Sequence, residues 1–383
     1  MDKYTITDTK ALEEFCALAA QEEYLSIDTE FMREHTYYPK LCLVQIGLQE
    51  KAAIIDPLAE GIDLSPLFAL LQDKSVTKVF HAARQDLEIF YVLMGKMVEP
   101  VFDTQVASMA TSRSEQLSYH SLVLEMLEVD LDKGSRMTKW DRRPLSAAQI
   151  QYAFYDVTYL HKIYPMLLKK LSGREGWIAA ALERLCDPEN LVTPPEKAWK
   201  TIKSKTLKPA QKGALAVIAE WREARAQTKN VPKRWLLSDE SVLTLAQSLP
   251  KTLAEAEQLR LKPKKVSGLE QLIEKIAASK PMSEPVRKRK TPYSPPNEDL
   301  LNVFRLALHT CSHEHGFAQR LICTANELQS LSALHPDDAE WAEHPLQQGW
   351  RRDVFGLLAE KITRGTVCLR FSGGRLLFEE IKE

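Results

Sequence analysis

The sequence predicts an α/β domain with a mixed β-sheet, followed by two small all-helical domains. Strand and helix patterns alternate over about the first half of the 383 residues, and strand patterns then disappear from about residue 207. Proline-rich polar stretches lie before and after the first all-helical part. A chain of this length has room for two or three domains.

The first domain opens with neighbouring strands and continues with alternating strands and helices. Four stretches are candidate strands: 24–31 (YLSIDTEF), 41–48 (LCLVQIGL), 52–56 (AAIID) and 76–82 (VTKVFHA). Helical patterns follow at about 84–95, 104–112, 118–128 and 146–171. This order predicts a mixed sheet. We expect the domain to span residues 1–190, because CDPENLVTPPEKAW is rich in proline and polar residues.

Residues 207–286 form the first predicted helical domain. Apolar residues recur at helical spacing in three segments, 213–227, 239–249 and 269–279. Asp239 stands where the N-cap of the second of these helices is expected.

Residues 297–383 form a second predicted helical unit. The preceding stretch PMSEPVRKRKTPYSPPNED holds five prolines and a four-residue basic run, which predicts a linker. The unit ends in TVCLRFSGGRLLFEEI, where Gly373 and Gly374 are expected to turn a short hairpin.

The composition is typical of a globular protein in a reducing compartment. Hydrophobic residues make up 44% of the chain, and no apolar run approaches the ~20 residues that span a bilayer. The start, MDKYTITDTK, lacks the basic and apolar regions of a secretory signal. Six scattered cysteines never form a CxxC pair, which favours reduced thiols. We therefore expect a cytoplasmic protein with no membrane partner.

The charge is strongly segregated although the net charge is only −1. Residues 1–190 carry a net charge of −9, residues 191–296 carry +12 and residues 297–383 carry −4. A strongly basic block suggests a polyanionic partner that binds mainly through the middle of the chain. From charge alone, a solvated basic surface explains the block about equally well.

Two acids lie close together in the first strand, LSIDTEFM. Side chains two apart in a strand point to the same face, so Asp28 and Glu30 are neighbours. Their repulsion and partial burial are unfavourable unless a cation binds between them.

Further acids follow on helices. Asp86 opens a helix after the strand VTKVFHA, and Tyr152 and Asp156 share a face of a later helix that begins with a Ser146–Gln149 capping box. Taken singly, Asp86 is explained by the helix dipole and Asp156 by solvation. Only the pair in the strand requires a cation.

Together these motifs resemble the DEDD superfamily of 3′→5′ exonucleases in its tyrosine-bearing branch. The segments IDTEFMREHTYYPKLCLVQIG, FHAARQDLEIF, FDTQVA and WDRRPLSAAQIQYAFYDVTYL resemble the ribonuclease D family more closely, and the similarity covers nearly the whole chain. The resemblance implies a ribonuclease-H-like exonuclease fold for the first domain.

The resemblance also implies a site with two Mg²⁺ or Mn²⁺ ions. Hard divalent cations prefer oxygen ligands, and a pair of them stabilises the charge that develops in phosphodiester hydrolysis. By the family pattern, Asp28 is shared by both ions, and Glu30 and Asp156 complete the site of the ion that activates water. Asp86 helps to hold the second ion, and Tyr152 orients the attacking water.

Three neighbouring residues are candidate substrate contacts. Phe31 and Met32 follow the strand acids and are expected to support the terminal bases. His81 is expected at the edge of the substrate; a hydrogen-bonded histidine that closes its strand is an equally good interpretation.

The helical domain at 207–286 resembles the helicase-and-RNase-D C-terminal (HRDC) module, which commonly contributes to nucleic-acid binding. The similarity lies in AEWREARAQTKNVPKRWLLSDESVLTLAQSLP, with Trp221, Arg222, Asn230, Pro232 and Asp239. The unit at 297–383 resembles a divergent second copy through CTANELQSL and GWRRDVFG.

Other site classes receive no support. CSHEHG resembles a zinc site only superficially, because its surroundings are helical and its spacing matches no common zinc motif. The chain has no GxxxxGK[ST] motif, so no ATP partner is expected.

The resemblance implies a 3′→5′ exoribonuclease that trims structured RNA, above all precursor tRNA, and releases nucleoside 5′-monophosphates. Two alternatives stay open: a 3′→5′ DNA exonuclease, because nothing in the motifs reads the 2′-hydroxyl, and a non-catalytic RNA-binding protein on an exonuclease fold. Retention of all four acids and the tyrosine argues against the second.

Overall fold

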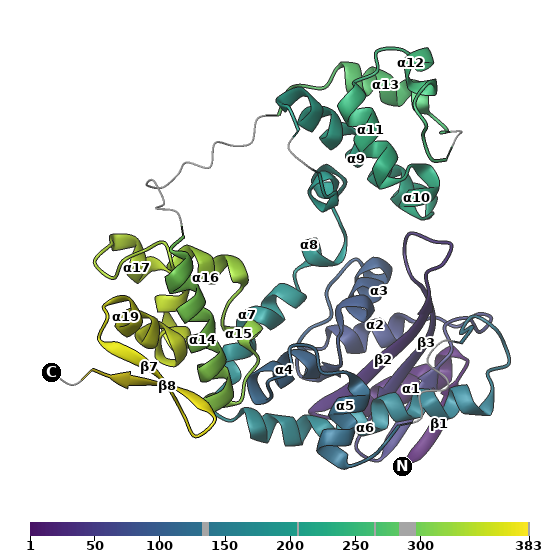
Figure 1. Ribbon diagram of the computed structural model, residues 1–383. Coiled ribbons are helices and arrows are strands. Elements are labelled where there is room, and N and C mark those ends of the chain that lie inside the picture. The colour runs from purple at the N-terminus through teal and green to yellow at the C-terminus, as the bar shows by residue number, and fades with distance from the viewer. Residues whose placement is uncertain (132–137, 205–206, 264–265, 283–295, 382–383) are drawn as a thin grey trace.

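The computed structural model describes residues 1–131, 138–204, 207–263, 266–282 and 296–381. It shows an α/β domain, a helical module and a C-terminal module, which lie around an open centre in Figure 1. Below, the α/β domain means residues 1–190, the helical module means residues 207–286 and the C-terminal module means residues 297–383.

Within the described residues, six strands form one sheet in the order β1-β4-β3-β2-β5-β6. The strands are β1 (Asp2–Ile6), β2 (Tyr24–Met32), β3 (Lys40–Gly47), β4 (Lys51–Ile55), β5 (Thr77–Phe80) and β6 (Val101–Asp103). β2, β3 and β4 pair antiparallel, whereas β1 with β4, β2 with β5 and β5 with β6 pair parallel. The mixed sheet is therefore confirmed, and β1 and β6 extend it beyond the predicted strands.

Two sets of helices cover the sheet (Figure 1). Helices α1 (Thr9–Ala19), α2 (Ser65–Gln72) and α3 (Arg84–Met94) share a core with alternate residues of β2, Leu25 and Ile27. The long helix α6 (Ala147–Leu171) covers the opposite face and packs against β2, β3 and β4. Helices α4 (Thr104–Thr111), α5 (Tyr119–Leu127), α7 (Glu175–Leu185) and α8 (Pro188–Leu191) complete the domain.

Helix α6 lies unusually close to the sheet. The hydroxyl of Ser26 donates to the Val157 carbonyl at 2.8 Å, and a Cβ at Gly47 would lie 2.5 Å from the Ser26 Oγ and 2.8 Å from the same carbonyl. Gly47 therefore permits this approach. The predicted Ser146–Gln149 capping box is present at the start of α6 and fixes where the helix begins.

The helical module has its own hydrophobic core. It consists of α9 (Pro209–Lys229), α10 (Lys233–Leu236), α11 (Asp239–Ser248), α12 (Leu253–Glu257) and α13 (Leu269–Ala277), and the short helix η1 (Pro195–Thr201) joins its core. The prediction that Asp239 caps α11 is wrong. Ser238 is the N-cap, because its side chain accepts from the Ser241 N–H, and the Asp239 carboxylate instead lies 2.7 Å from the buried guanidinium of Arg222.

The C-terminal module is helical and ends in the predicted hairpin. Its elements are α14 (Glu298–His315), α15 (Gln319–Ile322), α16 (Ala325–Leu331), α17 (Ala339–Glu343), η2 (Pro345–Gln347), α18 (Gly349–Arg351), η3 (Arg352–Gly356), α19 (Leu357–Thr363), β7 (Val367–Ser372) and β8 (Arg375–Glu380). Gly373 and Gly374 both have positive φ in the turn. The CSHEHG segment lies on α14 and in its C-cap, as its helical surroundings predict, and most of the predicted linker lies outside the described residues.

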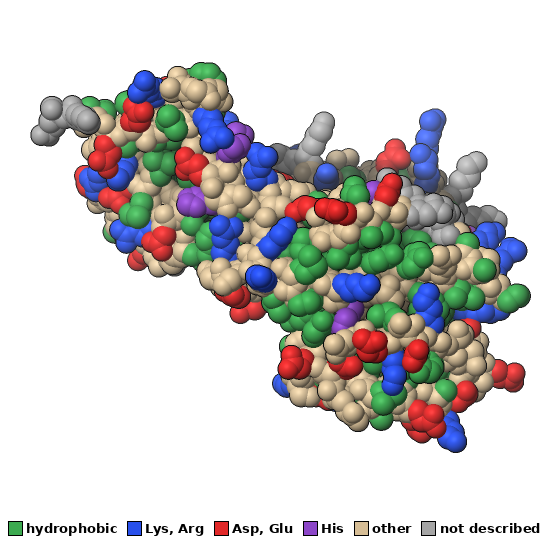
Figure 2. Space-filling model, turned by 90° about the horizontal axis from the view of Figure 1, so that it is seen from below, with side chains coloured by type: hydrophobic (Ala, Val, Ile, Leu, Met, Phe, Trp, Pro, Cys, Tyr) green, Lys and Arg blue, Asp and Glu red, His purple; other side chains and the backbone are tan. Residues whose placement is uncertain are grey.

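The C-terminal module contacts the α/β domain directly. The indole rings of Trp177 on α7 and Trp350 on α18 stack with centroids 4.7 Å apart, and the Ala318 N–H donates to the Met109 carbonyl at 2.7 Å. Seen from below, the surface carries acidic and basic side chains interspersed with hydrophobic ones (Figure 2). The described residues therefore form no continuous basic surface on this face.

The sequence also predicts reduced thiols and no membrane-spanning segment. All six cysteines are free thiols. Of the helices that the structure describes, none is both long and apolar enough to cross a membrane.

Candidate active site

Three acids from two elements meet beside the sheet. Asp28 and Glu30 project from β2, and Asp156 projects from α6; one carboxylate oxygen of each lies within 4.8 Å of the others. The alternation of β2 produces this arrangement, because Ser26, Asp28 and Glu30 share the face that α6 covers. We call these three residues the acidic cluster.

A β-bulge follows the cluster directly. The pairing of β2 with β3 shifts register between Glu30 and Phe31, so that Glu30 pairs with Leu43 whereas Phe31 pairs with Leu41. Bulges bend a strand and redirect its side chains, and they are common beside active sites. Here the bulge separates the two strand acids from the loop that follows β2.

Asp86 approaches the cluster from α3. It lies in the first turn of that helix, is buried, and accepts a hydrogen bond from the hydroxyl of Thr29. Thr29 stands between the two strand acids, so this bond ties α3 to β2 at the site. Asp86 lies outside the 4.8 Å group but faces the same cavity as Asp28 and Asp156.

Burial and neighbouring carboxylates raise the pKa values of Asp28, Glu30 and Asp86. Burial raises the pKa of Asp28, and the Asp156 carboxylate adds to the shift. Burial, followed by Asp28, Asp156 and Asp86, raises the pKa of Glu30 to about 10. Burial and then Asp28 raise the pKa of Asp86 well above its usual value. In the absence of a cation, the site therefore favours protonated carboxyl groups.

This donor set fits hard divalent cations. Every candidate ligand is a carboxylate oxygen. Burial and mutual repulsion disfavour the ionised carboxylates, and a bound divalent cation offsets both. Asp28, Glu30 and Asp156 are close enough to hold one ion together, and Asp86 lines the same cavity as Asp28 and Asp156.

A cavity of about 560 Å³ opens in front of the acids. Phe31, His81 and Tyr152 line its wall, so two of the three predicted substrate contacts and the predicted water-orienting tyrosine face it. Met32 does not line it; its side chain packs against a separate apolar cluster that includes Trp140.

His81 is held by two hydrogen-bonding groups. Its Nδ1 lies 2.9 Å from the Thr104 hydroxyl and its Nε2 lies 3.1 Å from the Leu117 carbonyl. Burial lowers its pKa, so the neutral ring is favoured, with Nε2 donating to the carbonyl. His81 thus closes its strand, as one interpretation predicts, while one side of it faces the cavity.

Sequence reasoning missed Tyr119. Its hydroxyl lies 2.9 Å from the Tyr155 carbonyl and 2.7 Å from the Asp156 carbonyl, so Tyr119 anchors α6 where that helix presents its acid. Burial first, and then Asp156 and Asp28, raise the pKa of Tyr119. No local pattern predicts this contact between residues 37 apart. The cavity lining also includes residues that sequence reasoning did not predict, among them Thr29, Gln85, Gln105, Gln116, Ser118 and His120.

Comparison with known proteins extends these observations to the whole chain. A family model described as 3′-5′ exonuclease matches residues 4–172, and a model described as HRDC domain matches residues 211–278. Ribonuclease D of Sphingobium indicum is 40% identical over 383 residues, covering 97% of each chain. Ribonuclease D of Gluconacetobacter diazotrophicus is 39% identical, covering 98% of this chain and 96% of its own.

A solved structure shows the same fold. The crystal structure of Escherichia coli RNase D, described as an exoribonuclease involved in structured RNA processing, superposes with a TM-score of 0.77 at 28% identity. The match covers 95% of this chain and 99% of that chain. It confirms the predicted fold class, a ribonuclease-H-like domain with a mixed sheet followed by small helical domains.

Proposed function

Because the chain belongs to the ribonuclease D family of 3′→5′ exoribonucleases, we propose that it trims the 3′ ends of structured RNA, above all precursor tRNA, by hydrolysis that depends on two divalent cations. The observation that carries the proposal is the convergence of Asp28, Glu30 and Asp156, with Asp86 facing the same cavity. The free cysteines are consistent with action in the cytoplasm.

In the proposed reaction, water attacks the terminal phosphodiester and the bond to the 3′-oxygen of the preceding nucleotide breaks. The products are a nucleoside 5′-monophosphate and an RNA shortened by one residue. Two cations held by the four carboxylates would stabilise the negative charge on the attacking and leaving oxygens. Tyr152, which lies one helical turn before Asp156 and faces the cavity, would orient the water. Phe31 would stack against the terminal base.

The charge distribution supports an RNA substrate larger than the cavity. The α/β domain carries −9, whereas residues 191–296, which include the helical module, carry +12. We assign phosphate contacts distant from the cleavage point to this basic segment, because such contacts supply most sequence-independent affinity for nucleic acids. The C-terminal module, with −4, would shape the substrate path rather than bind phosphate.

The decisive experiment is a parallel digestion of a 3′-extended tRNA and a DNA of matched sequence, with Mn²⁺ or Mg²⁺ and then with excess chelator. We expect stepwise release of nucleoside 5′-monophosphates from the RNA, a defined stopping point near the mature end, and no release with chelator. Faster digestion of the DNA would contradict the assigned substrate, and digestion that survives the chelator would contradict the role of metal.

A further inference from the structure

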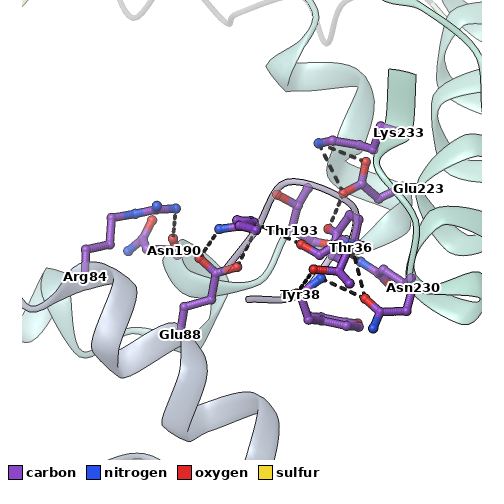
Figure 3. Close-up of polar contacts among 12 residues, drawn as sticks. Thr36, Tyr38, Arg84, Glu88, Asn190, Thr193, Glu223, Asn230 and Lys233 are labelled. Carbon is purple, nitrogen blue, oxygen red and sulfur yellow. Dashed lines mark hydrogen bonds and ion pairs between the residues drawn. The ribbon is translucent and has the colours of Figure 1, made fainter. Parts of the chain in front are cut away.

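The loop between β2 and β3 contacts the helical module (Figure 3). This loop, residues 33–39, continues the strand that carries Asp28 and Glu30, beyond the bulge. We call it the docking loop. It meets the end of α9 and the start of α10, which are almost 200 residues away in sequence.

Asn230 makes the most specific contact. Its Oδ1 accepts hydrogen bonds from two successive backbone N–H groups of the docking loop, those of Tyr37 at 3.1 Å and Tyr38 at 3.0 Å. Asn230 is the C-cap of α9 and has a φ of 48°, a left-handed conformation that asparagine and glycine adopt most readily. One residue thus ends the helix and holds the loop.

A buried carboxylate makes the second contact. The Tyr37 hydroxyl donates to Glu223 on α9, and the Gln227 side chain donates to the same hydroxyl at 3.2 Å. Glu223 is fully buried and also pairs with Lys233 on α10 at 3.2 Å. A buried carboxylate needs such partners, so Tyr37 is held firmly against the module.

The docking loop is also tied to the helix that carries Asp86. Arg33 donates to both carboxylate oxygens of Glu88 on α3, at 3.0 and 2.7 Å, and Glu88 is buried. A bidentate pair of this kind fixes orientation as well as distance. The docking loop therefore makes polar contacts both with α3, which carries Asp86, and with the helical module.

These contacts border a polar cleft of about 370 Å³ beside the active site. Arg84, two residues before Asp86, and Arg234 on α10 both line it, and Arg84 also donates to the Asn190 carbonyl at 2.8 Å. Both are exposed. They can contact the same strand of RNA only while the module keeps its position relative to α3. The module has its own core, so this position is a matter of docking rather than of folding.

We propose that Asn230, Tyr37 and Glu223 are positioning residues that hold the helical module in one orientation, so that structured RNA bound by the module presents its 3′ end to the acidic cluster. The inference rests on the proposed function. It makes the contact between the docking loop and the helical module responsible for which RNA substrates are cleaved. Structured RNA requires docking, whereas a short single strand reaches the cavity without it.

Asn230→Gly is the test variant, because glycine keeps the left-handed conformation and removes only the acceptor. We expect kcat/KM for 3′-extended tRNA to fall about tenfold, mainly through KM, since small misplacements of a bound substrate have large kinetic effects. The value for a short single-stranded oligonucleotide should change less than about twofold. Asn230→Asp, which restores an acceptor oxygen, should recover most of the loss.

Two controls separate docking from other causes. Asp239→Asn weakens the ion pair with Arg222 inside the module and leaves the docking loop untouched, so it should not change the ratio between the two substrates. Hydrogen exchange at the Tyr37 and Tyr38 amides reports on the contact without RNA, and both should exchange faster in Asn230→Gly.

Unaltered exchange in Asn230→Gly would overturn the inference, because the contact would then be absent in solution. Faster exchange with an unaltered substrate ratio would also overturn it, because docking would not affect substrate choice. If the unsubstituted protein digests neither RNA, the proposed function fails and the inference falls with it, while the exchange data still show whether the loop docks.

Discussion

The buried carboxyl groups of Asp28, Glu30 and Asp86 repel one another when ionised. They are therefore favoured either in the protonated form or as ligands of a cation. Burial and mutual repulsion are the main causes of the raised pKa values of Asp28, Glu30 and Asp86. Such a site exchanges protons for a cation, which couples metal affinity to pH. Two predictions follow from this coupling.

Asp28→Asn should abolish exonuclease activity, with a loss of at least about a hundredfold, because it removes the acid expected to be shared by both ions. The same change should stabilise the metal-free protein at pH 8, by on the order of 1 kcal/mol, because burial and the Asp156 carboxylate disfavour the ionised form of Asp28, which asparagine does not have. Thermal unfolding without metal measures the second effect. A metal-free variant less stable than the unsubstituted protein would show that the acids do not repel one another.

The pH dependence of metal-free stability should follow the sign of these shifts. Folding raises the pKa of Glu30 from 4.5 to about 10, so its contribution is fully present below pH 4.5 and is lost as pH rises toward 10. Bound Mn²⁺ or Mg²⁺ removes the repulsion, so the rise in Tm on adding metal should be greater at about pH 8 than at about pH 6. Calorimetry across this range measures it, and a rise that shrinks with pH would contradict the assignment.

Helices and strands set the positions of the active-site carboxyl groups. The close packing of α6 against the sheet is the part of this arrangement that tolerates least change. Gly47→Ala would bring a methyl group into the Ser26 hydroxyl and the Val157 carbonyl, next to Asp156. We expect a destabilisation of about 1–3 kcal/mol, together with lower kcat, because α6 must move away from β2. Denaturant unfolding and single-turnover kinetics measure the two effects.

Gly176→Ala is the matched control. Gly176 lies on α7, and nothing lies within 4 Å of the position of its added Cβ. This change should leave activity intact and stabilise the protein by about 0.4–1 kcal/mol. Equal effects of the two substitutions would show that the contact between α6 and the sheet is not tight.

The sequence predicted those elements that carry a strong hydrophobic pattern. The buried strands β2 to β5 and helices α3 to α6 agree with their predicted positions within a few residues. β1 was not predicted because four of its five residues are exposed, and β6 is only three residues long. Asp239 is acidic and opens a helix, which favours it as a cap in sequence, whereas Ser238 one residue earlier has the capping geometry.

The site was predictable only in part, for a physical reason. Asp28, Glu30 and Asp156 carry a pattern in sequence, but Thr29 and Tyr119 act through contacts that depend on tertiary packing. The docking contact of Asn230 is likewise invisible in sequence, since its partners lie 192 and 193 residues away.

Over the full chain, net charge differs between the α/β domain and the helical module, and we propose that the first cleaves RNA while the second binds it. The acidic α/β domain holds the site, and the basic helical module lies across the open centre from the C-terminal module (Figure 1). Substitution of the exposed residues Lys229, Arg234 and Arg260 by glutamine should weaken tRNA binding and flatten its salt dependence. Each lost phosphate contact should lower the slope by about 0.7–0.9.

Binding measured at several salt concentrations tests this prediction. Arg370→Gln on the exposed hairpin of the C-terminal module is the control, because it removes the same kind of charge from the acidic part of the chain. An equal change of slope in the control would remove the helical module's special role in binding.

The stacked indoles of Trp177 and Trp350 have a practical consequence. Their rings are nearly parallel, with an interplanar angle of 10°, and one belongs to each side of the contact between the α/β domain and the C-terminal module. Each ring is covered on one face by the other, so separating the two parts would change the surroundings, and hence the fluorescence, of both indoles. The protein thus carries an intrinsic optical reporter, which would register separation of these two parts during a turnover without any attached dye.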